Sequence, residues 1–125
     1  MRAIVFRGKN DGDWVFGSLT FSFKEDAHYI TVHDKDELSF LVETETIGQW
    51  TGLSDKNGRL MFEGDIVNGL FLFGLTVEAV VVFRDGAFGL EWRRGKVSTF
   101  NAFTSICNVA FEVIGNIHDN PELLL

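Results

Sequence analysis

The sequence is poor in cysteine, proline and tyrosine, with one of each among its 125 residues. The single Cys107 cannot form a disulfide within the chain, so we expect a small buried apolar side chain in a reducing compartment. Thirteen glycines against one proline favour tight turns between short strands over a disordered linker.

Basic residues are also in the minority, since 11 Lys and Arg stand against 18 Asp and Glu, for a formal net charge of −7. This excess repels phosphate backbones at long range but leaves room for a local basic cluster. No apolar run approaches the length that crosses a membrane. The first six residues run into Arg7 and Lys9 and are too short for the apolar region of a signal peptide. We therefore expect a cytoplasmic protein.

The usual motifs of catalysis and metal binding are missing. There is no glycine-rich phosphate loop and no Gly-x-Ser-x-Gly elbow, and the three histidines, His28, His33 and His118, lack metal-ligand spacing. Residues 55–58 match the start of a calcium loop but lack its later ligands. The sequence therefore predicts no enzyme, no metal and no cofactor.

Short runs of apolar, aromatic and β-branched residues alternate with turn signals, which is typical of an all-β protein. We expect strands at residues 3–6, 14–23, 29–32, 38–42, 60–62, 66–67, 77–84, 87–92 and 110–117. Gly17 is expected to mark a bulge or a crowded point in its strand. Residues 47–53 read as an irregular connection with Trp50 in the core. Ser98 or Thr99 could cap at most one short helix near residues 99–107, and a loop fits that segment equally well.

The two-residue turn Asp85-Gly86 fixes the register of a predicted hairpin. Counting outward places three apolar pairs on one face, namely Phe83 with Phe88, Val81 with Leu90 and Ala79 with Trp92. We predict that this face packs inward. The opposite face, with Val80 and Val82, is mixed and could be covered by another strand or another subunit.

A second hairpin is predicted at residues 55–58, because Asn-Gly tolerates the positive φ angles of tight turns. Asp65 is more readily explained by bonds to backbone amides at the start of a strand than by a catalytic pair with Glu63. We therefore predict structural anchors rather than catalytic residues. They are Trp50, Gly58, Gly64, Asp65 and Gly86.

Two segments are candidate binding surfaces. The only basic cluster, which could face a nucleic acid or another partner, consists of Arg84, Arg93, Arg94 and Lys96. Residues 69–75, with Phe71 and Phe73, are strongly apolar. They form either a buried strand or an exposed interface that favours self-association.

Three blocks carry a family resemblance: residues 46–53 (TIGQWTGL), residues 55–58 (DKNG) and residues 62–67 (FEGDIV). Together with residues 6–9, 14–19 and 111–123, they resemble the YopX family of phage and prophage proteins. The resemblance implies a small SH3-like roll or barrel with additional strands, and it implies no particular activity.

The sequence therefore predicts one domain over residues 1–125, with a possible division into an N-terminal β subdomain (1–42) and a barrel-like core (43–118). Its expected function is that of a non-enzymatic phage or prophage accessory protein. Such a protein would bind another protein or itself as a homo-oligomer. The alternative is a small β-barrel that binds nucleic acid.

Overall fold

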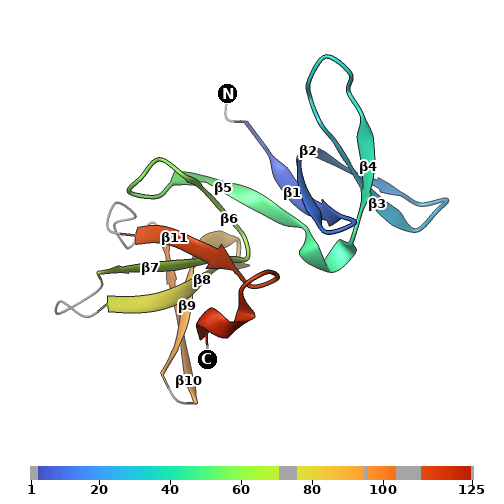
Figure 1. The fold of residues 1–125 in the computed structure, drawn as a ribbon. Helices are drawn as coiled ribbons and strands as arrows, with labels where there is room; N and C mark the ends of the chain where they lie inside the picture. Colours follow the sequence, from blue (N-terminus) through green and yellow to red (C-terminus); the bar gives the residue numbers. More distant parts are fainter. Residues whose placement is uncertain (1–2, 71–75, 95, 104–110, 125) are drawn as a thin grey trace. The chain divides into compact units, whose positions relative to one another are not determined.

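The computed structural model describes residues 3–70, 76–94, 96–103 and 111–124, which form two compact units, residues 1–50 and 51–125. The strands in chain order are β1 (Phe6–Asn10), β2 (Asp13–Ser22), β3 (Ala27–Thr31), β4 (Ser39–Val42), β5 (Gly48–Ser54), β6 (Leu60–Phe62), β7 (Asp65–Leu70), β8 (Thr76–Arg84), β9 (Ala87–Arg94), β10 (Val97–Ala102) and β11 (Phe111–Asn116). Two short 3-10 helices, η1 (Thr44–Thr46) and η5 (Pro121–Leu124), complete these elements (Figure 1). The all-β prediction is confirmed, but the first strand, expected at residues 3–6, spans Phe6–Asn10 instead.

The first unit is an antiparallel meander in the order β4-β3-β2-β1, and individual hydrogen bonds also join the β4 region to β1. The Glu43 amide donates to the Lys9 carbonyl at 2.9 Å, and the Asn10 side-chain amide donates to the Leu41 carbonyl at 2.8 Å. The Lys9 amide donates in turn to the Thr46 hydroxyl at 2.9 Å. Farther along β1, β5 takes over, with its residues 48 and 49 paired to residues 7 and 6. The second edge of β1 is therefore occupied by later parts of the same unit.

At two positions of this unit, neighbouring atoms leave no room for a side chain, so glycine is required. A Cβ at Gly8 would lie 3.0 Å from Val42 Cβ and 3.2 Å from Ile30 Cδ1, and these two side chains are buried. A Cβ at Gly17 would collide with the Thr31 carbonyl oxygen of β3. The prediction of a crowded point at Gly17 is confirmed.

The second unit is built on a five-stranded antiparallel sheet in the order β10-β9-β8-β7-β11. One face of this sheet carries the apolar core, against which Trp92 and Phe103 also pack. The buried members are Met61, Val67, Ala79, Val81, Leu90, Phe111 and Val113. The side chain of Val113 thus lies in the core, although its strand is the outermost on that side of the sheet.

The predicted β8–β9 hairpin is confirmed in register, from Arg84 opposite Ala87 to Val80 opposite Glu91. Val81 and Leu90 are buried as expected. Phe83, however, is 51% exposed, so the prediction that it packs inward is wrong. It lies next to the turn, beyond the buried part of the sheet, and its ring instead meets the Phe88 ring edge to face, with centroids 4.9 Å apart.

Two local predictions are wrong. The segment near residues 99–107 was expected to be a short helix or a loop, but its first residues belong to strand β10, which pairs with β9 along its whole length. The remainder of the predicted helix, through Cys107, lies almost entirely outside the described residues. Residues 47–53, expected to be irregular, belong largely to β5. In both places pairing with a distant or neighbouring strand overrides the local preference for a turn or cap. The division into 1–42 and 43–118 and the SH3-like barrel stay predictions.

Candidate interaction site at the edges of the second sheet

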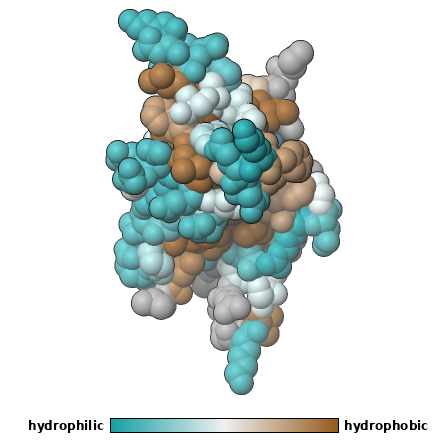
Figure 2. Space-filling model, turned by 90° about the vertical axis from the view of Figure 1, so that its right-hand side faces the viewer, coloured by the Kyte–Doolittle hydropathy of each residue, from teal (hydrophilic) through white to brown (hydrophobic). Residues whose placement is uncertain are grey.

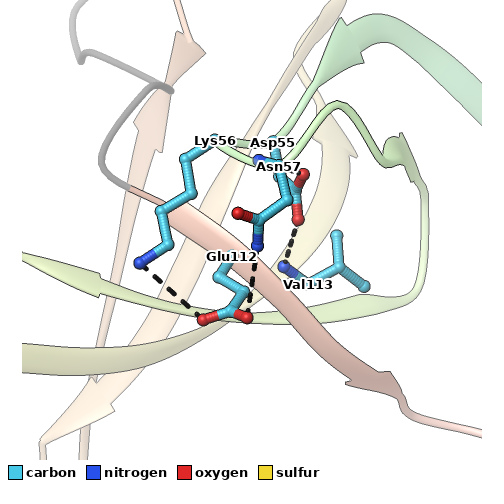
Figure 3. A network of polar contacts seen from close by, with 5 residues as sticks. All are labelled: Asp55, Lys56, Asn57, Glu112 and Val113. Atoms are coloured by element: carbon cyan, nitrogen blue, oxygen red, sulfur yellow. Dashed lines mark hydrogen bonds and ion pairs between the residues drawn. The ribbon is translucent and has the colours of Figure 1, made fainter.

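The two outer strands of the five-stranded sheet, β11 and β10, differ in whether the rest of the chain forms hydrogen bonds to their outer edges. On one side, the turn between β5 and β6 closes the outer edge of β11 (Figure 3). The Lys56 amide donates to the Phe111 carbonyl at 2.9 Å, and the Val113 amide donates to Asp55 Oδ2 at 2.8 Å. An exposed strand edge is a template for pairing with another chain, and these two bonds occupy it.

Asp55 shapes this turn as well as attaching it. Its Oδ1 accepts the amides of Asn57 and Arg59, both at 2.9 Å, and the turn closes with the Asp55 amide donating to the Arg59 carbonyl at 2.8 Å. Gly58 has φ +81°, the left-handed conformation that completes such a turn. Only 6% of Asp55 is exposed. The predicted hairpin at residues 55–58 is therefore confirmed.

The charge of Asp55 is stabilised where it lies. Burial raises the pKa of its carboxyl group, but the amides of Val113, Arg59 and Asn57 and the positive charge of Arg59 outweigh burial and lower the pKa below its ordinary value of 3.8. The carboxylate is thus ionised across the neutral pH range. Side chains add a second layer, since Lys56 Nζ lies 3.8 Å from Glu112 Oε2 and Asn57 Nδ2 donates to Glu112 Oε1 at 3.3 Å (Figure 3).

On the other side of the sheet, β10 has β9 as its neighbour, and no strand among the described residues lies against its outer edge. Its first five residues, Val97 to Asn101, carry no charge and no proline. Val97 is 64% exposed. Such an edge lacks the devices, charged side chains and proline, with which proteins discourage strand pairing.

Phe100 on β10 is held by close packing. A Cβ at Gly89 of β9 would lie 2.7 Å from two atoms of the Phe100 ring. The absence of that Cβ is what lets the half-buried ring lie across its neighbouring strand. The open edge therefore belongs to a strand that lies closely against β9 and pairs with it along its whole length.

The predicted basic cluster is only partly described. Arg84 forms an ion pair with Glu91, which lies diagonally across the hairpin, so its charge is compensated within the sheet. Lys96 is exposed, and Arg93 and Arg94 lie in β9, whose side chains at these positions are outside the described residues. Phe71, Phe73 and Cys107 are outside them too. Their roles stay predictions.

Each predicted anchor has an identifiable position. Asp65 is 2% exposed, and its Oδ2 accepts the Phe62 amide at 2.7 Å, as expected for a carboxylate at the start of a strand. Gly64 and Gly86 have φ +89° and +81° at the turns before β7 and β9. Trp50 is half-buried in β5 and is not among the buried core residues, so the prediction that it lies in the core is wrong. Its amide donates to the Val5 carbonyl at 2.8 Å.

The first unit holds a cluster that the sequence analysis missed. Arg7 lies over the Trp14 ring, with its guanidinium carbon 4.6 Å from the ring centroid, and Lys9 Nζ lies 5.3 Å from the same ring. Phe16, two residues along β2, is 46% exposed. In the sequence, the two cations are two residues apart, and so are the two aromatic residues. They come together only because Arg7 pairs with Phe16 and Lys9 pairs with Trp14 across the two strands.

Within the described ranges, no three His, Cys, Asp or Glu side chains gather in a way that could hold a metal ion. His33 Nε2 lies 2.5 Å from the Ser18 hydroxyl, and His28 Nδ1 lies 3.2 Å from the Thr44 hydroxyl. No helix in the same ranges is long and apolar enough to cross a membrane.

The fold and its edges thus define an all-β protein with two antiparallel sheets. The YopX family model, described as "YopX protein", matches residues 5–125, and the chain belongs to this family of uncharacterised proteins. Among curated proteins, none matches the sequence.

Two solved structures resemble the chain over its whole length. The protein EF1440 from Enterococcus faecalis is 25% identical, with a TM-score of 0.59 and 100% of both chains covered. The protein yopX from Bacillus subtilis is 18% identical, with a TM-score of 0.65, and covers 100% of this chain and 99% of its own. At 18% identity, the similarity to yopX from Bacillus subtilis shows a shared fold and nothing more.

Proposed function

We propose that this chain is a phage- or prophage-derived accessory protein of the host cytoplasm that acts by binding protein, and that it has no catalytic activity. The phage origin rests on the family resemblance, and the binding role rests on the outer edge of β10. Strand addition at such an edge uses backbone hydrogen bonds for affinity and alternate side chains for specificity.

The contrast between the two edges supports this assignment. The buried carboxylate of Asp55 and the backbone amide of Lys56 form hydrogen bonds to the outer edge of β11. The chain leaves β10 neutral, with the first residue of this strand, Val97, exposed. On the face drawn in Figure 2, apolar side chains lie in several places between polar ones. A strand edge offers a more specific docking site than such scattered apolar surface.

Capture with two baits tests the binding role. The wild-type chain and Ser98→Lys, which places a charge on exposed β10, are immobilised side by side and exposed to extracts of phage-infected or prophage-induced cells. We expect proteins retained by wild type and lost with Ser98→Lys. Identical protein sets on both baits, or none on either together with a strictly monomeric chain, would contradict the proposal.

Nucleic-acid binding is the second candidate, because Trp14 with its two cations joins an aromatic surface to positive charge. The net charge of −7 and the pairing of Arg84 with Glu91 oppose it. Anisotropy of labelled single-stranded oligonucleotides decides between the two. Binding through this cluster should weaken steeply with added salt and be lost in Trp14→Ala. Absence of binding at low salt ends this second candidate.

A further inference from the structure

We propose that the partner at the β10 edge is a second copy of this chain. Two copies pair their β10 strands antiparallel about a two-fold axis at Thr99, which joins two five-stranded sheets into one continuous sheet. This inference rests on the proposed protein-binding function and names the occupant of its site.

Symmetry fixes which side chains meet. A two-fold axis perpendicular to the sheet keeps the core faces of both copies on one side, so each residue must face one of its own parity along the strand. With the axis at Thr99, this residue faces Thr99 of the second copy, Val97 faces Asn101, and Ser98 faces Phe100. Cross-strand Thr–Thr pairs are favourable.

Charge does not oppose a second copy at this place, although it does elsewhere on the surface. Copies of a chain with a net charge of −7 repel each other, and the neutral run from Val97 to Asn101 brings no like charges face to face. In this register, the exposed Val97 gains an opposite neighbour and loses contact with water. The Thr99 register requires only these five residues.

Other edges of the described sheets offer the second copy less. The turn at Asp55 and Lys56 occupies the outer edge of β11. The outer strands of the other sheet are β4, whose Leu41 carbonyl already accepts the Asn10 side chain, and β6, which has only three residues. The β10 strand is also extended before any partner binds, because it pairs with β9 along its whole length. Five residues from each copy bury less surface than a permanent interface, so the dimer should form reversibly with concentration.

Sedimentation velocity from micromolar to millimolar concentration tests the pairing, with three proteins compared. Wild type should pass from monomer to dimer, and Ser98→Lys should weaken association at least about tenfold. The matched control is Thr20→Lys, which adds the same charge at an exposed position of β2, a strand with neighbours on both sides. It should associate like wild type. A wild type that stays monomeric, or a Ser98→Lys variant that associates equally well, overturns the inference.

Cysteine cross-linking tests the register. In a Cys107→Ser background, Thr99→Cys should form a disulfide-linked dimer on mild oxidation, because directly opposite Cα atoms lie about 4.5–5.5 Å apart. Ser98→Cys should not, because its two copies are diagonal neighbours about 7–8 Å apart. Equal or faster cross-linking of Ser98→Cys contradicts the Thr99 register.

The outcomes separate this inference from the proposed function. A monomeric wild type that captures another protein, with capture lost in Ser98→Lys, refutes the second copy and leaves the protein-binding function standing. A monomeric wild type that captures nothing refutes both. Concentration-dependent dimers abolished by Ser98→Lys support both.

Discussion

Replacing Asp55 by Asn should destabilise the second unit by about 1.5–4 kcal/mol, because one carboxylate satisfies three backbone amides. The side chain is buried, so solvent screening does not reduce this effect. Asn supplies a single acceptor oxygen. If that oxygen keeps the amides of Asn57 and Arg59, the side-chain NH₂ faces the Val113 amide, donor against donor.

The magnitude follows from these contacts. The Val113 amide is buried and loses a bond to a charged acceptor, worth about 1.5–3 kcal/mol. The two turn amides lie beside exposed residues and exchange a charged acceptor for a neutral one, which adds up to about 1 kcal/mol.

Urea unfolding followed by circular dichroism measures the loss, and hydrogen exchange of the Val113 amide localises it. Asp85→Asn is the matched control, because Asp85 is an exposed turn residue with φ +51°, a conformation that Asn accepts. We expect this control to stay within about 0.5 kcal/mol of wild type. Equal stability of the two variants, with unchanged exchange at Val113, would refute the reasoning.

Three further perturbations test other parts of the structure. Because the pKa of Asp55 is lowered in the folded chain, its contribution is complete above the ordinary value of 3.8 and is lost as the pH falls toward the lowered value. The stability gap between wild type and Asp55→Asn should therefore narrow from about pH 6 to about pH 3, and a constant gap contradicts this. Gly17→Ala should cost about 1–3 kcal/mol in thermal unfolding, because its Cβ meets the Thr31 carbonyl; a neutral effect shows that β2 and β3 are less closely apposed. Gly89→Ala should displace the Phe100 ring and increase protease cleavage in β10, and an unchanged cleavage pattern argues against that packing.

Local patterns in the sequence predicted the β8–β9 hairpin well. The turn Asp85-Gly86 and the alternation of apolar residues determine the register, and both signals lie within one short segment. Phe83 was misplaced because alternation says which face a side chain is on and not where the buried part of that face ends. Its exposure depends on how far the hairpin extends beyond the core.

The helix expected near Ser98 and Thr99 shows the limit of local signals. Both residues are common N-caps, and both also fit strands. Pairing with β9 across a short connection decides in favour of β10. The sequence alone offers no measure of that pairing.

The sequence could not predict that the turn at Asp55 covers the outer edge of β11, because the two segments are far apart in the chain. The turn at Asp55 was predicted from its own residues, but its partner Val113 is 58 positions away. No motif joins the two. The open edge of β10 is equally a property of strand order, which appears only once β7 and β11 are known to pair.

Hydrogen exchange of the backbone amides in β10, measured in dilute and in concentrated protein, tests most directly whether one edge of this sheet is closed and the other open. The account predicts that in dilute protein the Val113 amide exchanges slowly while the outward-facing amides of residues 97–101 exchange fast. Those outward-facing amides should become protected as the concentration rises. Slow exchange of every β10 amide in dilute monomer would contradict the account, because the edge would then already be covered.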